Sequence, residues 1–322
     1  MSETQTKTTL DQLKLHTTVV ADTSDFELIE KYRPQDATTN PSLILKSSQK
    51  EEYKDLIDEA ILFGKSQISK NTLDLIAIKL FVNFGLEILK KIPGRVSIEV
   101  DAKYSFDTEK SVEIARLIIS LFEKNGIDRE RILIKLATTY EGIKACEILE
   151  KENIHCNMTL LFSLAQAIGA ADAKATLISP FVGRILDWYK TNHKKEYLPQ
   201  EDPGVVSVTN IFNYFKKFDI KTQIMGASFR NANEIIELAG CDLLTISPNL
   251  LEELQTDDRD IQKKLNSELS KDMEIDEILF NEKTFRYMLN QDAMATEKLS
   301  EGIRKFEVDL NKIKNLIGDM LK

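Results

Sequence analysis

The stretch Arg131-Ile-Leu-Ile-Lys-Leu-Ala137 places a lysine, Lys135, in the middle of an aliphatic run. An ammonium group is costly to bury, so burial favours the uncharged amine. An uncharged lysine amine is a nucleophile that forms a Schiff base with a carbonyl compound. The alternative is a lysine at the edge of a sheet that reaches solvent and blocks aggregation. This stretch alone leaves both interpretations open.

Seven further strand-type runs lie on either side of this one. They are residues 17–22, 37–40, 95–101, 154–160, 175–182, 221–229 and 243–247. Helical stretches separate them, opened by capping-box patterns such as Ser24-Asp-Phe-Glu27 and Thr138-Thr-Tyr-Glu141. A long amphipathic helix over residues 297–321 follows the eighth unit. Eight β-α units in a chain of 322 residues predict a (β/α)₈ TIM barrel with additional N-terminal and C-terminal helices.

The competing fold is a doubly wound open sheet, which usually has a glycine-rich turn after its first strand. This chain has Ala21-Asp-Thr-Ser24 there instead. It contains no evident linker, short repeat or low-complexity region. We therefore predict one domain over residues 1–322, in which residues 1–10 form a flexible tail and residues 297–322 form a C-terminal helix packed on the barrel.

The charge balance limits the classes of partner. The chain has 43 basic and 52 acidic residues and no basic block, which argues against nucleic acid and anionic membranes as partners. The polar start and the lack of an apolar run of about 20 residues predict neither a signal peptide nor a membrane span. Phosphorylated substrates can still bind through local arginines.

Cysteines and histidines indicate no metal centre. Cys146, Cys156 and Cys241 are far apart, form no CxxC pair and suggest reduced thiols in a cytoplasmic protein. The three histidines have no metal-ligand spacing. Neither GxGxxG nor a P-loop occurs, so no nucleotide cofactor is expected.

Polar side chains, together with Phe181, gather late in the predicted strands, where the catalytic residues of a barrel lie. Side chains alternate between the two faces of a strand, and these residues share a parity within each strand. They are Asp22 on the first strand, Thr38 and Asn40 on the second, Glu99 on the third, Lys135 on the fourth, Asn157 and Thr159 on the fifth, Ser179 and Phe181 on the sixth, with Arg184 after it, and Ser228 and Arg230 on the seventh. A single such residue is usually a cap or turn residue. Their convergence from seven strands predicts one site.

The residue types fit carbon–carbon bond chemistry. Lys135 attacks a ketone to form an iminium, an electron sink that permits cleavage of a neighbouring carbon–carbon bond. Asp22 and Glu99 are the candidates for general acid–base work. Thr159 can help Glu99 to hold a water molecule for formation and hydrolysis of the imine.

Other polar residues of the set fit a phosphorylated sugar. Asn40, Asn157 and Ser179 suit sugar hydroxyls and developing charge. Arg184 and Arg230, with Ser228, suit a terminal phosphate, because the guanidinium fork matches phosphate oxygens.

The chain resembles the transaldolases of the pentose phosphate pathway, in their long class I form. The resemblance extends from about residue 11 to the C-terminus. Its specific stretches are Thr17-Thr-Val-Val-Ala-Asp-Thr23, Asp36-Ala-Thr-Thr-Asn-Pro-Ser-Leu43, Ile134-Lys-Leu-Ala137, Asn157-Met-Thr-Leu-Leu161, Ile178-Ser-Pro-Phe-Val-Gly-Arg184 and Met225-Gly-Ala-Ser-Phe-Arg230.

The resemblance implies a role for each matching residue. Lys135 is implied as the Schiff-base lysine, Asp22 as the acid/base at the C4 hydroxyl, and Glu99 with Thr159 as the pair that positions the catalytic water. The implied substrate contacts are Thr38, Asn40, Asn157 and Ser179, with Phe181 lining the site and Arg184, Ser228 and Arg230 on the phosphate.

The implied reaction moves a dihydroxyacetone unit from fructose 6-phosphate or sedoheptulose 7-phosphate to erythrose 4-phosphate or glyceraldehyde 3-phosphate. It needs no cofactor and no metal. The resemblance also implies a cytoplasmic homodimer. One alternative is an aldolase that releases free dihydroxyacetone, as in the shorter fructose-6-phosphate aldolases. A second is a catalytically inactive sugar-phosphate binding protein, which would be expected to lack Lys135, Asp22 or Glu99.

Overall fold

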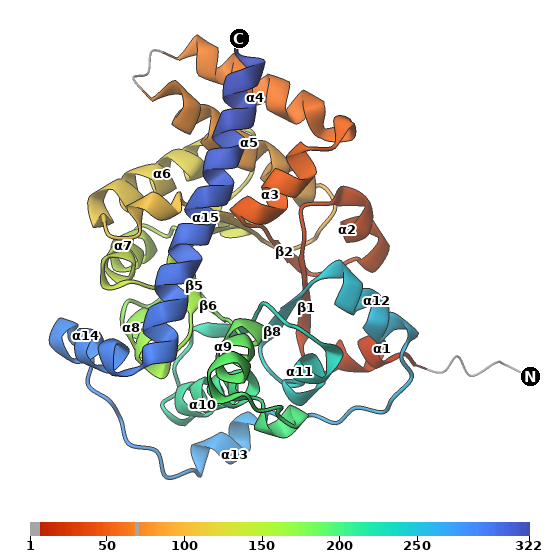
Figure 1. Cartoon of the computed structure of the whole chain (residues 1–322), viewed down its shortest axis with the longest axis vertical. Coiled ribbons are helices and arrows are strands. Elements are labelled where there is room, and N and C mark those ends of the chain that lie inside the picture. Colours follow the sequence, from red (N-terminus) through yellow and green to blue (C-terminus); the bar gives the residue numbers. More distant parts are fainter. Residues whose placement is uncertain (1–6, 68–70) are drawn as a thin grey trace, which may run out of the picture. The chain divides into compact units, whose positions relative to one another are not determined.

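The computed structural model describes residues 7–67 and 71–322. Its eight strands form a closed barrel in chain order, as the sequence predicted (Figure 1). The doubly wound open sheet is therefore excluded. The strands are β1 (Thr18–Asp22), β2 (Asp36–Thr38), β3 (Val96–Glu99), β4 (Ile132–Ala137), β5 (Cys156–Leu161), β6 (Leu177–Pro180), β7 (Gln223–Gly226) and β8 (Leu243–Ile246).

Helices alternate with these strands. They are α1 (Thr9–Leu13), α2 (Phe26–Tyr32), α3 (Pro41–Ser48), α4 (Lys54–Ser66), α5 (Thr72–Leu89), α6 (Thr108–Lys124), α7 (Tyr140–Lys151), α8 (Leu164–Asp172), α9 (Gly183–His193), α10 (Pro203–Lys217), α11 (Ala232–Glu237), α12 (Pro248–Thr256), α13 (Ser267–Lys271), α14 (Glu282–Gln291) and α15 (Ala293–Met320). Short 3-10 turns are η1 (Glu51–Tyr53), η2 (Ala102–Tyr104), η3 (Arg129–Arg131) and η4 (Pro199–Glu201). No helix within residues 7–67 and 71–322 has both the length and the apolar character needed to cross a bilayer.

The chain separates into two compact units. The first unit comprises residues 1–22 and 159–299, and the second comprises residues 23–158 and 300–322. The prediction of one domain over the whole chain stays a prediction. We describe the residues of each unit separately.

The first unit contains β1, β8, β7 and β6 as parallel neighbours. Thr18 of β1 pairs with Leu243 of β8, and Met225 of β7 pairs with the same residue. A bridge between Phe181 and Ala227 continues the pairing beyond the ends of β6 and β7. This extension matters because the residues that follow it are the predicted phosphate contacts.

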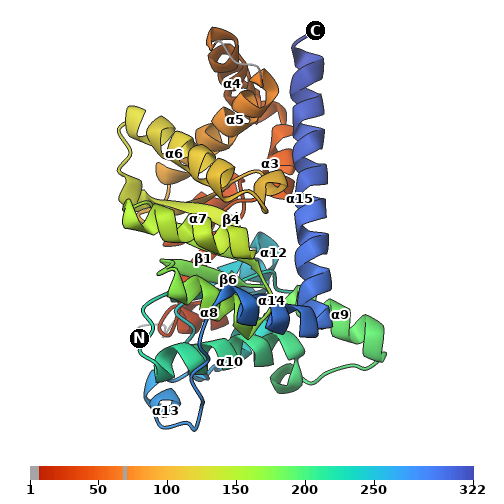
Figure 2. The same ribbon diagram turned by 90° about the vertical axis from the view of Figure 1, so that its left-hand side faces the viewer.

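The second unit contains β2, β3 and β4. In the register of β3 and β4, Glu99 lies opposite Lys135. The alternate residues of these strands, such as Ile98 and Ile134, are fully buried. The helices α6 and α7 lie side by side against each other (Figures 1 and 2). Period-2 alternation predicts this arrangement, in which Ile98 and Ile134 lie on one face of the strands and Glu99 and Lys135 on the other.

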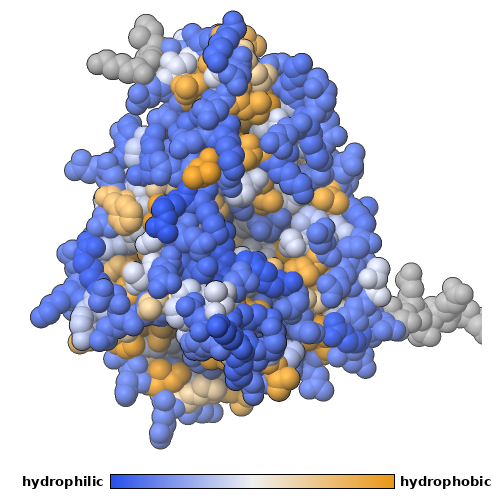
Figure 3. Space-filling view, in the orientation of Figure 1, coloured by the Kyte–Doolittle hydropathy of each residue, from blue (hydrophilic) through white to orange (hydrophobic). Residues whose placement is uncertain are grey.

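From Ser300 onward, α15 belongs to the second unit. Lys314 Nζ lies 2.7 Å from Asp74 and 2.9 Å from Asp101, and Ser42 donates a hydrogen bond to Asp309. The apolar face of this segment is buried, and the opposite face of α15 is mostly hydrophilic (Figure 3). The sequence predicted an amphipathic helix here, and the structure extends it to Ala293.

Two predicted helix caps are each wrong by one residue. Asp25, not Ser24, caps α2 by accepting the N–H of Glu27, while the Ser24 hydroxyl donates to the carbonyl of Leu43. Thr139, not Thr138, caps α7. The residues at these turns are all good caps, so only the tertiary contacts choose between neighbours.

The second strand and the N-terminus also differ from the predictions. Asn40 lies beyond β2, where its side chain caps α3 by accepting the N–H of Leu43 at 3.0 Å. Of the predicted flexible tail, residues 1–6 lie outside the described residues. Thr9 and Leu10 belong to α1 and are fully buried.

An ion pair at the start of β2 provides a stability prediction. The carboxylate of Asp36 accepts hydrogen bonds from the backbone N–H of Arg95 and from its guanidinium at 2.8–3.0 Å. Asp36→Ala leaves the half-buried guanidinium without its partner, so we expect the free energy of unfolding to fall by about 3 kcal/mol. Urea titration measures it. Lys221→Ala, which breaks an exposed pair with Asp219, is the control and should change little. Equal losses in both variants would contradict the argument.

Candidate active site

The second unit holds the predicted nucleophile. Lys135 is only 4% exposed, which excludes the solvent-reaching edge lysine. Its Nζ lies 3.3 Å from Glu99 Oε2 and donates a hydrogen bond to the carbonyl oxygen of Thr39 at 3.1 Å. The register of β3 and β4 produces this pairing, because it places two residues of the same parity side by side.

The Glu99 carboxylate affects the chemistry that Lys135 can do. A carboxylate at this distance stabilises an ammonium, whereas burial destabilises it. The amine must lose a proton before it attacks a carbonyl carbon. Glu99 is placed to accept that proton, and its own position on β3 is fixed by the strand.

An aromatic ring from α15 covers the lysine. The Phe306 ring centroid lies 5.9 Å from Lys135 Nζ, and Phe306 is buried. The sequence analysis did not identify this residue. Its spacing from Leu310 and Ile313 is that of any core-facing helix position, so the sequence contains no signal for a functional contact.

Asn157 is held in the second unit by a buried hydrogen-bond chain. Its Nδ2 donates to Ser97 Oγ at 3.0 Å, and Thr39 Oγ1 donates to the Ser97 carbonyl at 2.9 Å. Thr38 is also buried, at the end of β2. Ser97 was not among the predicted site residues, although it has the same parity as Glu99 on β3.

The first unit holds the other predicted residues. Asp22 ends β1 and is half-buried. Thr159 and Ser179 are buried late in β5 and β6. Each therefore occupies the strand position expected from the sequence.

The structure brings the predicted phosphate residues together at the start of α9. The Gly183 N–H donates to the carbonyl of Ser228 at 2.9 Å, and Arg230 Nη1 lies 3.4 Å from Ser228 Oγ. The Arg184 guanidinium carbon lies 4.8 Å from the Phe181 ring centroid. No side chain among the described residues caps this helix. An uncapped helix N-terminus beside two arginines favours an anion.

Gly183 is required for this close approach. A Cβ atom there would lie 2.5 Å from Arg230 Cγ and 2.6 Å from the Ser228 carbonyl oxygen. Ser228 itself has φ of 61°, a conformation that L-residues rarely adopt. The segment of residues 228–230 is thus packed tightly against α9.

Asp187 is a partner of Arg230 that the sequence analysis missed. Its carboxylate accepts from Arg230 Nη2 at 2.7 Å and from Nε at 3.0 Å. This bidentate pair occupies one edge of the guanidinium and leaves the Nη1 edge beside Ser228. The pair orients Arg230 but also places a negative charge near the predicted phosphate position.

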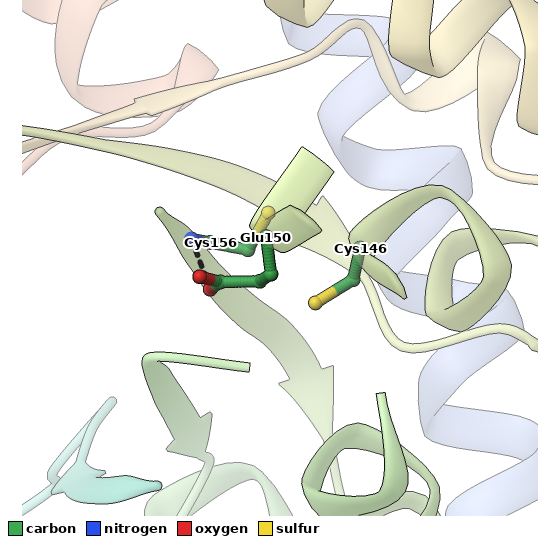
Figure 4. A group of neighbouring side chains, drawn as sticks. All are labelled: Cys146, Glu150 and Cys156. Atoms are coloured by element: carbon green, nitrogen blue, oxygen red, sulfur yellow. Dashed lines mark hydrogen bonds between the residues drawn. The ribbon is translucent and has the colours of Figure 1, made fainter. Parts of the chain in front are cut away.

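A cluster of Cys146, Glu150 and Cys156 has the donor types of a metal site (Figure 4). Its three donor atoms lie within 4.8 Å of one another. However, the Glu150 carboxylate accepts the N–H of Cys156 at 2.8 Å and also contacts the ring of His155. Burial, with the neighbouring Cys146 thiol, raises the pKa of Cys156, which disfavours the thiolate that a metal needs. The cluster is better explained as packing at the start of β5.

Comparisons with known proteins show the family of this chain. The sequence model described as transaldolase/fructose-6-phosphate aldolase matches residues 19–317. A protein named transaldolase from Protochlamydia amoebophila is 59% identical over 318 residues, which cover 98% of this chain and 99% of the relative. The human protein named transaldolase is 56% identical over 97% of this chain and 94% of its own length. A transaldolase from Aeromonas salmonicida is 56% identical over 97% of this chain and 99% of its own length. The chain therefore belongs to the transaldolase/fructose-6-phosphate aldolase family of enzymes, on its transaldolase side.

Proposed function

We propose that the chain is a transaldolase of the non-oxidative pentose phosphate pathway. It transfers a dihydroxyacetone unit from fructose 6-phosphate or sedoheptulose 7-phosphate to erythrose 4-phosphate or glyceraldehyde 3-phosphate. The observation that carries the proposal is the buried amine of Lys135 beside Glu99, in a chain that matches transaldolases over nearly its whole length. The proposal includes a cytoplasmic homodimer that uses neither a metal nor a cofactor.

The chemistry begins at Lys135. Its neutral amine adds to the ketone carbonyl, and the carbinolamine loses water to form an iminium. Asp22 takes the proton of the C4 hydroxyl, the C3–C4 bond breaks, and its electron pair flows into the iminium to form an enamine. The aldose phosphate leaves. The enamine then adds to the aldehyde carbon of the acceptor, the new alkoxide is protonated, and water releases the product.

Glu99 and Thr159 handle the water that is lost and regained. Glu99 is the candidate to take the proton of the Lys135 ammonium, since its Oε2 lies 3.3 Å from Nζ. Phe306, whose ring lies near Lys135, helps to keep water from protonating the enamine in this proposal, and the buried Phe181 is assigned the same role.

Thr38, Asn40, Asn157 and Ser179 contact the sugar hydroxyls in this proposal. Asn157 is supported by Ser97, which fixes its carboxamide. The carboxamide oxygen of Asn40 is used to cap α3, so its amide nitrogen is the group that would contact a substrate. The phosphate lies at the N-terminus of α9 with Arg184, Ser228 and Arg230.

The requirement for an acceptor separates this function from that of a fructose-6-phosphate aldolase. With fructose 6-phosphate alone, we expect about one enzyme equivalent of glyceraldehyde 3-phosphate, because the enamine stays on Lys135. Adding erythrose 4-phosphate should speed sustained release by at least about 100-fold. A coupled assay for glyceraldehyde 3-phosphate measures both rates. Rapid, sustained release of free dihydroxyacetone without an acceptor would refute the transferase assignment.

A further inference from the structure

Two buried carboxyl groups of the first unit have no part in the chemistry proposed above. Asp202 precedes α10 and is 4% exposed, and Glu234 lies on α11 and is 1% exposed. The two carboxyl groups lie within hydrogen-bonding reach of each other. Burying two such groups together is costly unless their polar atoms are satisfied.

Glu234 connects this pair to the proposed phosphate segment. Its Oε2 accepts the backbone N–H of Arg230 at 2.6 Å. Asp202 Oδ1 accepts the N–H groups of Gly204 and Val205 at the start of α10, at 2.8 and 3.4 Å. The pair therefore links the first turn of α10 to the residue whose guanidinium lies beside Ser228.

A shared proton would satisfy the remaining oxygen of Glu234. Glu234 Oε1 is buried, and no donor among the residues that the structure describes reaches it. Two ionised carboxylates cannot hydrogen-bond to each other, whereas one proton between them satisfies both. Burial, with the Asp202 charge, raises the pKa of Glu234 to about 7, and burial also raises the pKa of Asp202.

We propose that Asp202 and Glu234 share one proton, and that this pair positions the segment of residues 228–230 for binding of the sugar phosphate. The inference rests on the proposed function, in which Arg230 contacts phosphate. Both residues are positioning residues, since they act through the backbone of Arg230.

Loss of the shared proton has a defined consequence. It leaves two negative charges side by side in a buried place, so they repel each other and the bond to the Arg230 N–H is strained. Among the described residues, the cation that acts on Asp202 is Lys190 of α9, which is paired with Glu196. Arg230 contacts Glu234 through its backbone N–H, while its guanidinium is paired with Asp187. The raised pKa means that the proton is held below about pH 7 and lost above it. Affinity for phosphorylated donors should therefore fall as pH rises through this value.

The deciding variant is Glu234→Gln in the full chain. Glutamine still accepts the Arg230 N–H and donates its own N–H to Asp202, but it has no proton to lose. The KM for fructose 6-phosphate is measured from about pH 6 to about pH 8.5, with saturating erythrose 4-phosphate. Titration of the substrate phosphate affects both proteins equally, so it cancels in the ratio of the wild-type KM to the KM of Glu234→Gln. We expect this ratio to rise about tenfold across the range while the ratio of kcat stays constant.

Glu234→Ala tests the positioning role at a single pH. It removes the acceptor of the Arg230 N–H, so we expect the KM for fructose 6-phosphate to rise about tenfold at about pH 6 with little change in kcat. The matched control is Glu237→Ala on the same helix, which breaks only an ion pair with Lys264. A ratio that does not change with pH, or equal effects of the two alanine variants, would overturn the inference. If Glu234→Ala fails to fold, the pH comparison with Glu234→Gln still decides.

Arg230→Ala separates failure of this inference from failure of the proposed function. If this variant leaves the KM for phosphorylated donors unchanged, the proposed phosphate site is wrong, and the positioning role is wrong with it. If Arg230→Ala raises that KM but the wild-type to Glu234→Gln ratio stays flat, only the shared-proton inference is overturned.

Discussion

Lys135→Ala is expected to reduce the transfer rate with fructose 6-phosphate and erythrose 4-phosphate by about 10⁴-fold or more. The variant lacks the amine that forms the Schiff base, and neither Glu99 nor the Thr39 carbonyl can form one. Lys135→Met is a second variant without the amine, and methionine fills more of the space under Phe306 than alanine does. Both variants should show native circular dichroism and a cooperative unfolding transition.

Borohydride trapping locates the adduct directly. Reduction in the presence of fructose 6-phosphate should add a reduced three-carbon unit to the peptide that contains Lys135, as read by mass spectrometry. The control is Lys79→Met, because Lys79 is also buried, pairs with Glu59 at 2.8 Å and lies 5.8 Å from the ring of Phe63. It should keep both activity and trapping. An adduct on another lysine, or transfer at the wild-type rate by Lys135→Ala, would remove Lys135 from the mechanism.

Arg230→Ala is expected to raise the KM for fructose 6-phosphate about 100-fold, since a charge-assisted pair of hydrogen bonds to phosphate is lost. The KM for unphosphorylated dihydroxyacetone as donor should change little. The effect includes a second contribution, because the substitution leaves the Asp187 carboxylate without its partner and near the phosphate. Steady-state kinetics with both donors measures the difference.

Two further variants sharpen this test. Asp187→Asn removes the negative charge near the phosphate, so Asp187→Asn combined with Arg230→Ala should recover part of the lost affinity. Arg259→Ala breaks another Arg–Asp pair, with Asp257, and should leave both KM values unchanged. Equal increases for phosphorylated and unphosphorylated donors in Arg230→Ala would remove the phosphate role of Arg230.

The alternation of strand residues was sufficient to predict much of the fold and of the candidate site. Period-2 alternation placed Glu99 and Lys135 on the same face of their strands, and the register of β3 and β4 confirms that they are neighbours. The run of β-α units likewise predicted the closed barrel. Both inferences depend on residues close together in the chain, where side-chain direction follows from backbone geometry.

Boundaries and caps were less predictable. Ser24 and Asp25 are both good N-caps, as are Thr138 and Thr139, and local preference does not distinguish them. The choice depends on the tertiary contacts of the two neighbours. The Ser24 hydroxyl, for example, donates to the carbonyl of Leu43 and does not cap α2. Asn40 was assigned to the strand predicted over residues 37–40, but it is the cap of the helix that begins at Pro41.

The sequence by itself determined the barrel, the buried lysine with its neighbouring glutamate, and the basic residues after β6 and β7. Only the tertiary structure decided that Phe306 covers Lys135, that Asp187 holds Arg230 and that Asp202 meets Glu234. The physical reason is that strand parity and helix periodicity are local properties of the backbone. These three contacts join residues far apart along the chain, and they depend on how each helix packs within its unit.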